Sequence, residues 1–194
     1  PGSFSRGAAF QPNEATGDRR ISGSLASLLG VERAIADKDE LALEIAVARI
    51  NCAYAMVYSF GGIPLLYMGD ELGLTNDYSY VDVAEHADDN RWLHRPKMPW
   101  NIAKTRNDTK TVAGKVFQSI THLGRVRASL PSLHAAVTTT VEVPANPAVV
   151  FFQRKHSAGS FLGVFNMSPV TQMVPADHIY QRGIVRPFDV LKDC

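Results

Sequence analysis

The sequence has little of what marks several common classes of protein. Its two cysteines, Cys52 and Cys194, lie far apart and indicate neither a disulfide framework nor a zinc site. The 20 basic and 19 acidic residues leave a net charge of +1, so composition does not indicate nucleic acid or an anionic membrane as a partner. The six histidines follow no metal-ligand spacing, and no phosphate-binding glycine loop precedes a helix. We therefore expect no metal and no cofactor.

One uncharged stretch, residues 50–68, is long enough to cross a membrane. It contains Asn51 and a Gly-Gly-Ile-Pro sequence at 61–64, and a proline removes a hydrogen-bond donor and would kink a spanning helix. We expect a helix, a break and a buried strand here instead. No signal peptide is visible, and we expect a soluble, cytoplasmic protein.

The first 60 residues predict a loop followed by helices. Residues 1–24 are rich in Gly, Ser, Pro, Asn and Arg, which is typical of an irregular loop, and residues 25–34 form a short apolar stretch. Asp37 followed by Glu40 has the form of a capping box at a helix start. A line of apolar residues at steps of four and three predicts the buried face of that helix: Leu41, Ile45, Ala48, Cys52 and Ala55.

The next part of the chain has the pattern of an α/β unit. Residues 63–68 are continuously apolar and glycine-bounded, which predicts a strand buried on both faces, as in a parallel sheet. A polar loop follows over 76–107, and a second helix is predicted over 111–129. In a parallel α/β barrel, long loops at the carboxyl ends of strands build the active site.

After Pro131 the pattern changes to β structure. Short β-branched or aromatic runs occupy 137–143, 149–154 and 161–165, separated by turn-forming residues. This pattern predicts antiparallel strands joined by hairpins. The best domain boundary is therefore near residue 130.

Three segments resemble a known family. Residues 61–73, GGIPLLYMGDELG, resemble the eighth-strand motif of the α-amylase superfamily of glycoside hydrolases. NDYSY at 76–80 and DDNRWLHRP at 88–96 look like the amylosucrase and sucrose hydrolase subgroup. Residues 2–23 are similar to the loop insertion after the seventh barrel strand of that subgroup. The segments occur in the family's order and together cover most of residues 1–130.

The resemblance implies an architecture and a division of the chain. It implies a loop-rich insertion over the substrate cleft at 1–36 and the last part of a (β/α)8 barrel at 37–130. The remaining residues, 131–194, would then be a C-terminal β-sandwich domain. The chain ends where further strands are expected, so we expect truncation at both ends.

The resemblance also implies an activity that this chain shares with an upstream part. The parent enzyme would cleave sucrose with retention and pass the glucosyl group to an α-glucan or to water. Retaining glycosidases need two carboxylates beside the scissile bond, and in the family these precede the region that Pro1 begins. We therefore expect no catalytic residue in this chain, an upstream catalytic half as its partner, and no activity of the chain alone.

Four residues are predicted to bind substrate. The resemblance places Arg91 at the closed end of the glucosyl pocket, paired with an upstream aspartate, and Arg20 beside the unit next to the cleaved bond. Gln11 and Asn13 align with acceptor-side polar positions. The alternatives are a surface salt bridge for Arg91 and a solvated loop position for Arg20.

The remaining acidic and aromatic residues of this region carry weaker predictions. Asp70 and Glu71 are neighbours on an extended chain and point to opposite sides, so they cannot readily act as a pair. We interpret them, and likewise Asp88 and Asp89, as turn-ordering residues. Trp92 is predicted to pack in the core, and the role of Trp100 is left open.

Two other functions fit parts of the sequence. A starch hydrolase or trehalose-type isomerase would share the 61–73 motif, although residues 88–96 argue against it. A non-catalytic carbohydrate-binding or structural module would explain the missing carboxylates. It would not explain residues 63–68, because one buried strand needs neighbouring strands.

Overall fold

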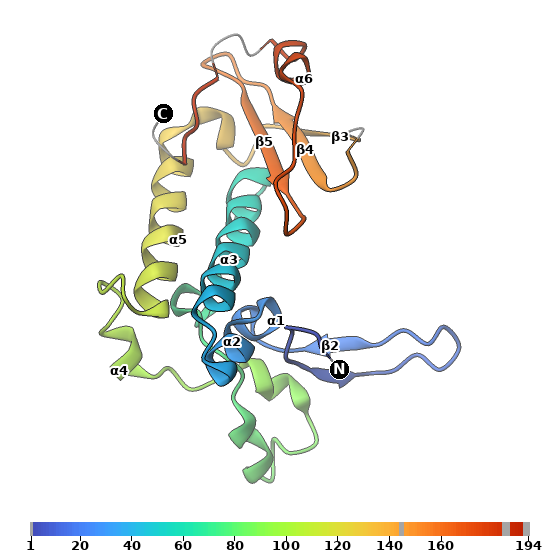
Figure 1. Cartoon of the computed structure of the whole chain (residues 1–194), viewed down its shortest axis with the longest axis vertical. Coiled ribbons are helices and arrows are strands. Elements are labelled where there is room, and N and C mark those ends of the chain that lie inside the picture. The colour runs from blue at the N-terminus through green and yellow to red at the C-terminus, as the bar shows by residue number, and fades with distance from the viewer. Residues whose placement is uncertain (1, 144–145, 184–186, 192–194) are drawn as a thin grey trace. The chain divides into compact units, whose positions relative to one another are not determined.

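The computed structural model describes residues 2–143, 146–183 and 187–191 and divides into two compact units (Figure 1). The first unit comprises residues Pro1–Asn51 and Leu66–Ile120, and the second comprises Cys52–Leu65 and Thr121–Cys194. Two long helices, α3 (Glu40–Phe60) and α5 (Val112–Ser129), contribute residues to both units. Cys194 lies outside the described residues.

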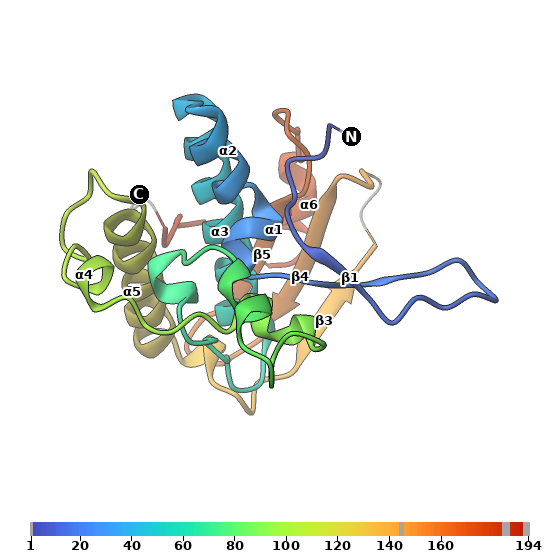
Figure 2. The same cartoon turned by 90° about the horizontal axis from the view of Figure 1, so that it is seen from below.

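The first unit consists of a small hairpin, short helices and a loop with 3-10 turns. Strands β1 and β2 pair antiparallel, and their connecting loop extends away from α1 and α2 (Figure 2). Besides parts of α3 and α5, its elements are β1 (Ala8–Phe10), β2 (Arg20–Ser22), α1 (Leu25–Leu29), α2 (Val31–Asp37), η1 (Asp70–Leu72), η2 (Tyr78–Asp82), η3 (Asn90–His94) and α4 (Trp100–Ala103).

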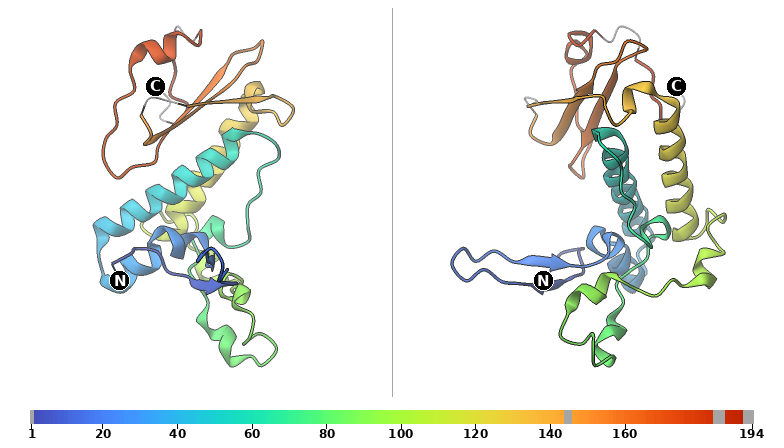
Figure 3. Two further views of the ribbon diagram at one scale, coloured as in Figure 1. Left: turned by 90° about the vertical axis from the view of Figure 1, so that its right-hand side faces the viewer. Right: turned by 180° about the vertical axis from the view of Figure 1, so that it is seen from behind.

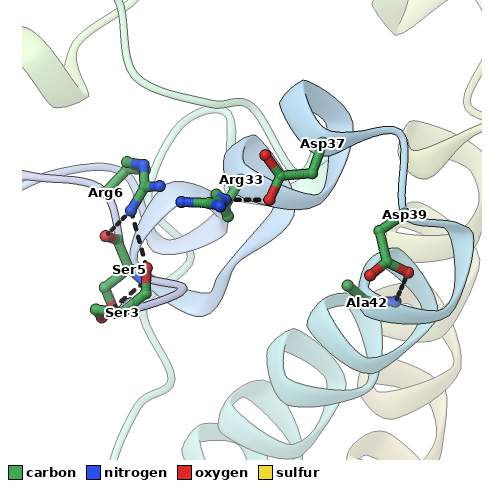
Figure 4. Close-up of polar contacts among 7 residues, drawn as sticks. All are labelled: Ser3, Ser5, Arg6, Arg33, Asp37, Asp39 and Ala42. Carbon is green, nitrogen blue, oxygen red and sulfur yellow. Dashed lines mark hydrogen bonds and ion pairs between the residues drawn. The ribbon is translucent and has the colours of Figure 1, made fainter. Parts of the chain in front are cut away.

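The helix starts differ from the predicted ones. The apolar stretch at 25–34 forms two helices because Gly30 adopts a left-handed conformation (φ 108°) that ends α1. Asp37 lies within α2 and pairs with Arg33, while Asp39 accepts from the Ala42 amide at the start of α3 (Figure 4). The capping box predicted at Asp37 is therefore wrong. Lys38 adopts a left-handed conformation and ends α2, so the residue that caps the start of α3 is Asp39 and not Asp37.

The buried face of α3 also differs from the predicted one. Leu41 is 72% exposed and Ile45 42% exposed, whereas Ala46, Val47 and Ile50 are buried. Of the predicted line, Ala55 is buried and Cys52 is half-buried, and burial raises the pKa of the Cys52 thiol. The helix is apolar on most of its circumference, so spacing alone did not select the buried side.

The strand predicted at 63–68 is not formed. Its residues lie outside every strand, and Ile63 and Leu65 are 89% and 78% exposed. Both sheets in the described part of the chain are antiparallel and neither includes this segment. A strand that is apolar on both faces needs neighbours on both edges and covers on both faces, which these residues lack here.

The second unit contains an antiparallel sheet, as the sequence predicts (Figure 3). The order is β3-β4-β5, with the central strand almost fully buried. In addition to the C-terminal parts of α3 and α5, the elements of this unit are η4 (Pro131–Leu133), β3 (Thr139–Glu142), β4 (Val149–Arg154), β5 (Phe161–Asn166) and α6 (Ala176–Tyr180). The described residues of this unit contain this one sheet, so a two-sheet sandwich stays a prediction.

Aromatic packing holds this sheet against the end of α3. Phe152 stacks on Phe165 with ring centroids 5.6 Å apart and meets the Phe60 ring edge-on at 5.3 Å. Gly163 lies opposite Phe152 in the register, and a β-carbon there would be 2.3 Å from that ring. Only glycine therefore fits at position 163 without moving the ring.

Arg154 connects the same sheet to α3 through hydrogen bonds. It is fully buried, and its guanidinium donates to the carbonyls of Ser59 at 2.9 Å and of His134 and Val137 at 2.6 and 2.9 Å. Burial, and secondarily the charge of Arg127, lower the pKa of Arg154. A cation at the C-terminal end of a helix is favoured by the helix dipole.

The described residues combine helix with small sheets, which is compatible with the predicted α/β class. The predicted helix at 111–129 is confirmed as α5, where Val116, Ile120 and Leu123 are buried. By length and mean hydropathy (1.4), α3 alone among the described helices could span a membrane. Because core helices pass the same test, this is weak evidence for a membrane protein.

Candidate functional site

The β1–β2 hairpin carries three of the four predicted binding residues. Arg20 pairs with Phe10 in the register, and its Nη1 donates to Oε1 of Gln11 at 3.3 Å. Asn13 orders the loop beyond them. Its backbone amide donates to the Asp18 carbonyl at 2.8 Å, and its side chain accepts from the Ala15 amide at 3.1 Å.

The short helix η3 carries the fourth residue, Arg91. Asp89 caps this helix by accepting from the Arg91 amide at 3.0 Å. The same carboxylate accepts from the guanidinium, with 2.7 Å between Nε and Oδ1 and 2.7 Å between Nη2 and Oδ2. The hydrogen bond from Arg91 is the main reason why the pKa of Asp89 falls to about 2, and the same pairing raises the pKa of Arg91.

Asn90 joins the hairpin to η3. Its Nδ2 donates to the Ala9 carbonyl at 2.8 Å, and its Oδ1 accepts from the Ser22 hydroxyl at 3.1 Å. Ala9 belongs to β1 and Ser22 to β2, so one side chain contacts both strands. Arg20, Gln11 and Arg91 are thereby held on one connected piece of structure.

A second asparagine fixes the start of the polar loop. Asn76 donates from Nδ2 to the Arg6 carbonyl at 3.1 Å and accepts at Oδ1 from the Ser24 amide at 2.8 Å. The Tyr78 hydroxyl donates to Glu32 at 2.7 Å. Burial raises the pKa of Tyr78, and Glu32 adds to the rise while the hydrogen bond with Asn76 opposes it. The loop is thus attached to α1, α2 and the segment before β1.

Aromatic side chains surround η3. Trp92 is half-buried and stacks on His86, with ring centroids 3.6 Å apart, and the Arg95 guanidinium lies 5.4 Å from the Trp92 ring. The Tyr67 ring lies against the His94 ring, with ring centroids 5.8 Å apart. Trp100 is 72% exposed. Trp92 therefore packs within the loop, in partial agreement with its predicted core role.

Arg91 is exposed over 54% of its side chain, and its partner in this chain is Asp89. The surface ion pair that the sequence left open as an alternative describes this arrangement. Nothing in the described structure tests the predicted pairing with an upstream aspartate, so the pocket role of Arg91 stays a prediction. Glu71 accepts from the Gly69 amide at 2.7 Å, which is a turn-ordering bond of the kind predicted for it.

The side chains of the hairpin and of η3 offer hydrogen-bond donors of the kind that bind ligands. Guanidinium and amide groups present donors suited to sugar hydroxyls or to anions. The described ranges contain no group of three or more His, Cys, Asp or Glu side chains placed to hold a metal ion. Asn76, Asn90 and Ser22 were not predicted from the sequence, because their partners lie about 50 to 80 residues away and no periodic pattern marks them.

Comparisons with known proteins agree with a carbohydrate-active enzyme. No family model matches the sequence. Over 146 residues, or 74% of the chain, it is 30% identical to glucosylglycerate phosphorylase of Escherichia coli (strain K12). The match covers 25% of that protein, so the chain spans about a quarter of the length of this relative. The similarity supports a relationship to sugar-active enzymes of the glycosidase type, and it does not identify the amylosucrase subgroup.

Proposed function

We propose that this chain is the C-terminal part of a retaining α-glucosyl enzyme that cleaves sucrose and transfers glucose to an acceptor. The observation that supports the proposal is the pair of hydrogen bonds from Asn90 to Ala9 and Ser22, because it attaches to η3, which carries Arg91, the hairpin with Arg20 and Gln11, the two residues predicted on the acceptor side. A glucosyl transferase needs fixed donors on both sides of the bond that it breaks.

Arg91 is suited to recognising a neutral sugar beside a carboxylate. Asp89 engages Nε and Nη2, and among the described residues Nη1 has no hydrogen-bond partner. Its two N–H groups are thus available to an incoming carboxylate or to sugar hydroxyls. In the proposed enzyme, Nη1 binds the upstream aspartate and closes the pocket behind one glucose unit.

The reacting carboxylates come from the upstream part in this proposal. One attacks the anomeric carbon of glucose while the other protonates the departing fructosyl oxygen, so that fructose leaves and a covalent glucosyl-enzyme forms. The second carboxylate, now ionised, takes the proton of the acceptor hydroxyl as that oxygen attacks the same carbon, and the bond from this carbon to the first carboxylate breaks. The two displacements together retain the α configuration.

The exposed apolar residues support an upstream partner. Ile63 and Leu65 are 89% and 78% exposed, and large apolar side chains exposed close together commonly mark a surface that a partner covers. In the proposed complete enzyme, the upstream part covers them, and residues 63–68 pair as the strand that their sequence predicts.

A second candidate is phosphorolysis, in which inorganic phosphate accepts the glucosyl group. The similarity to glucosylglycerate phosphorylase favours it. An arginine on the acceptor side, such as Arg20, suits phosphate because its planar fork matches two phosphate oxygens. The two candidates share the glucosyl pocket and differ in what reaches the intermediate.

The test uses the complete enzyme and varies donor and acceptor separately. Sucrose, glucosylglycerate, maltose and trehalose serve as donors, each with water, an α-glucan or inorganic phosphate. Fructose release from sucrose with glucan elongation or free glucose supports the proposal. α-Glucose 1-phosphate as the main product supports the second candidate, whereas maltose or trehalose as the preferred donor contradicts both. The 194-residue chain alone is expected to release no fructose.

A further inference from the structure

We propose that Asn90 is a positioning residue that sets acceptor choice by fixing the hairpin relative to Arg91. The inference rests on the proposed function for its kinetic consequence, while its structural content stands on the hydrogen bonds alone. Asn90 lies directly between Asp89 and Arg91 at the start of η3, so its hydrogen bonds attach the hairpin to the segment that carries the guanidinium.

The two bonds of Asn90 use both ends of its amide. Oδ1 can only accept and Nδ2 can only donate, and the partners match: the Ser22 hydroxyl donates at 3.1 Å and the Ala9 carbonyl accepts at 2.8 Å. An aspartate has the same shape but no donor, so it would place a negative oxygen against the Ala9 carbonyl. The two hydrogen bonds of Asn90 with Ala9 and Ser22, which we call the joint, therefore fit asparagine and not aspartate.

Strand geometry connects this joint to the acceptor-side residues. Side chains two residues apart on a strand point to the same face, so Arg20 and Ser22 share one face of β2. Because Ser22 is buried and bonded to Asn90, that face is the one directed toward η3. Arg20 thus projects on the η3 side of the hairpin, and Gln11 is held beside it by the 3.3 Å bond.

The remaining contacts of the hairpin do not replace the joint. Among the described residues, the backbone hydrogen bonds of the loop at its tip stay within the loop and join Asn13 to Gly17 and Asp18. The base of the hairpin is held by Asn76, which bonds to the Arg6 carbonyl and the Ser24 amide. Loss of Asn90 would leave the base attached and allow the Arg20 end to swing away from Arg91.

The kinetic consequence is a change in product partition. A displaced Arg20 binds the acceptor less well, while water still reaches the glucosyl-enzyme, so transfer falls relative to hydrolysis. A variant that merely folds less well lowers both products equally and leaves their ratio unchanged. The ratio therefore separates positioning from general destabilisation.

The experiment compares Asn90→Asp with Asn107→Asp in the complete enzyme. Asn107 is an exposed asparagine whose side chain makes no hydrogen bond in the described structure, so it controls for the added charge. We expect Asn90→Asp to lower the ratio of transfer to hydrolysis on the order of tenfold, as for loss of one buried hydrogen bond, and Asn107→Asp to leave it unchanged. Ser22→Ala should lower the ratio in the same direction, and the double variant with Asn90→Asp should be less than additive.

A second measurement tests the joint without any activity. Amide hydrogen exchange by mass spectrometry should show faster exchange in residues 8–22 of Asn90→Asp and unchanged exchange in residues 139–166, which contain β3, β4 and β5. Unchanged exchange at 8–22, or an unchanged product ratio in an enzyme that does transfer glucose, would overturn the inference. If the complete enzyme cleaves no sucrose but exchange at 8–22 rises, the proposed function fails while the structural joint stands.

Discussion

Asp89 holds the Arg91 guanidinium with one carboxylate oxygen 2.7 Å from Nε and the other 2.7 Å from Nη2. Because the same carboxylate caps η3, the direction of the arginine is set by the fold of the loop that carries it. The pairing also keeps Asp89 ionised down to a pH of about 2, the value to which its pKa is lowered. The orientation of Arg91 is thus set by a residue of its own loop.

Removal of the Arg91 side chain should have different effects in the chain alone and in the complete enzyme. In the chain, Arg91→Ala breaks an exposed ion pair, and such pairs contribute little to stability. In the complete enzyme that we propose, it would leave the predicted upstream aspartate buried without its partner, and kcat/KM for the glucosyl donor should fall on the order of a hundred- to a thousandfold.

Steady-state kinetics and urea unfolding of both forms measure this contrast. Lys97→Ala, at an exposed position of the same loop, is the matched control and should change neither quantity. Near-normal donor kinetics of Arg91→Ala would remove this residue from the glucosyl pocket.

Two exposed apolar residues should control the solubility of the isolated chain. Ile63→Ser with Leu65→Ser should raise soluble yield, because these side chains are 89% and 78% exposed. In the complete enzyme, where we propose that they are buried, each substitution should cost about 1.5–3 kcal/mol of unfolding free energy.

The control for this pair is Val143→Ser, which replaces another apolar residue that is almost fully exposed. It should not destabilise the complete enzyme, because nothing in the proposal covers that position. Equal stability of the complete enzyme with and without the 63/65 substitutions would mean that this segment stays exposed there too.

Arg154 should be essential for the second unit. Arg154→Ala leaves three carbonyls, one of them in a buried and two in partly buried hydrogen bonds, without their donor, and we expect a loss of about 3 kcal/mol of unfolding free energy. Arg125→Ala, which changes an exposed arginine on α5, should change stability by less than about 0.5 kcal/mol. Urea unfolding of the two variants, made in the chain that also carries Ile63→Ser and Leu65→Ser, measures both free-energy changes. A small effect at Arg154 would show that water or other groups satisfy these carbonyls.

His94 should make stability depend on pH. Burial, and secondarily the charge of Arg95, lower the pKa of His94 in the folded chain. The unfolded imidazole, with a pKa of about 6.5, then binds a proton at a higher pH than the folded one. Acidification below about 6.5 therefore favours the unfolded state, and stability should rise with pH up to that value and then level off for this residue.

Urea midpoints measured at several pH values between about 5 and 8, in the wild type and in His94→Gln, would show this dependence. The variant has no titrating group at position 94, so the difference between the two curves should change with pH below about 6.5 and stay constant above it. A difference independent of pH would mean that the folded and unfolded imidazoles titrate alike.

The elements that sequence predicted well are those whose pattern is local. Helix α5 has one clear apolar side, and strands β4 and β5 are apolar runs between turn residues, so their bounds were nearly correct. Helix α3 is apolar almost all round, and its buried face was therefore misassigned. The strand at 63–68 was predicted from its own residues, but a strand forms only with partners, and no described residue pairs with it.

The site shows the same division. The identities of residues 61–73 and 88–96 were enough to indicate a sugar-active enzyme. Arg20 and Arg91 were likewise chosen from residue identity alone. The fact that Asn90 bonds to Ala9 and Ser22, some 81 and 68 residues away in the chain, depends on folding. Long-range hydrogen bonds leave no periodic trace in a sequence, because each needs only one donor and one acceptor brought together by everything packed around them.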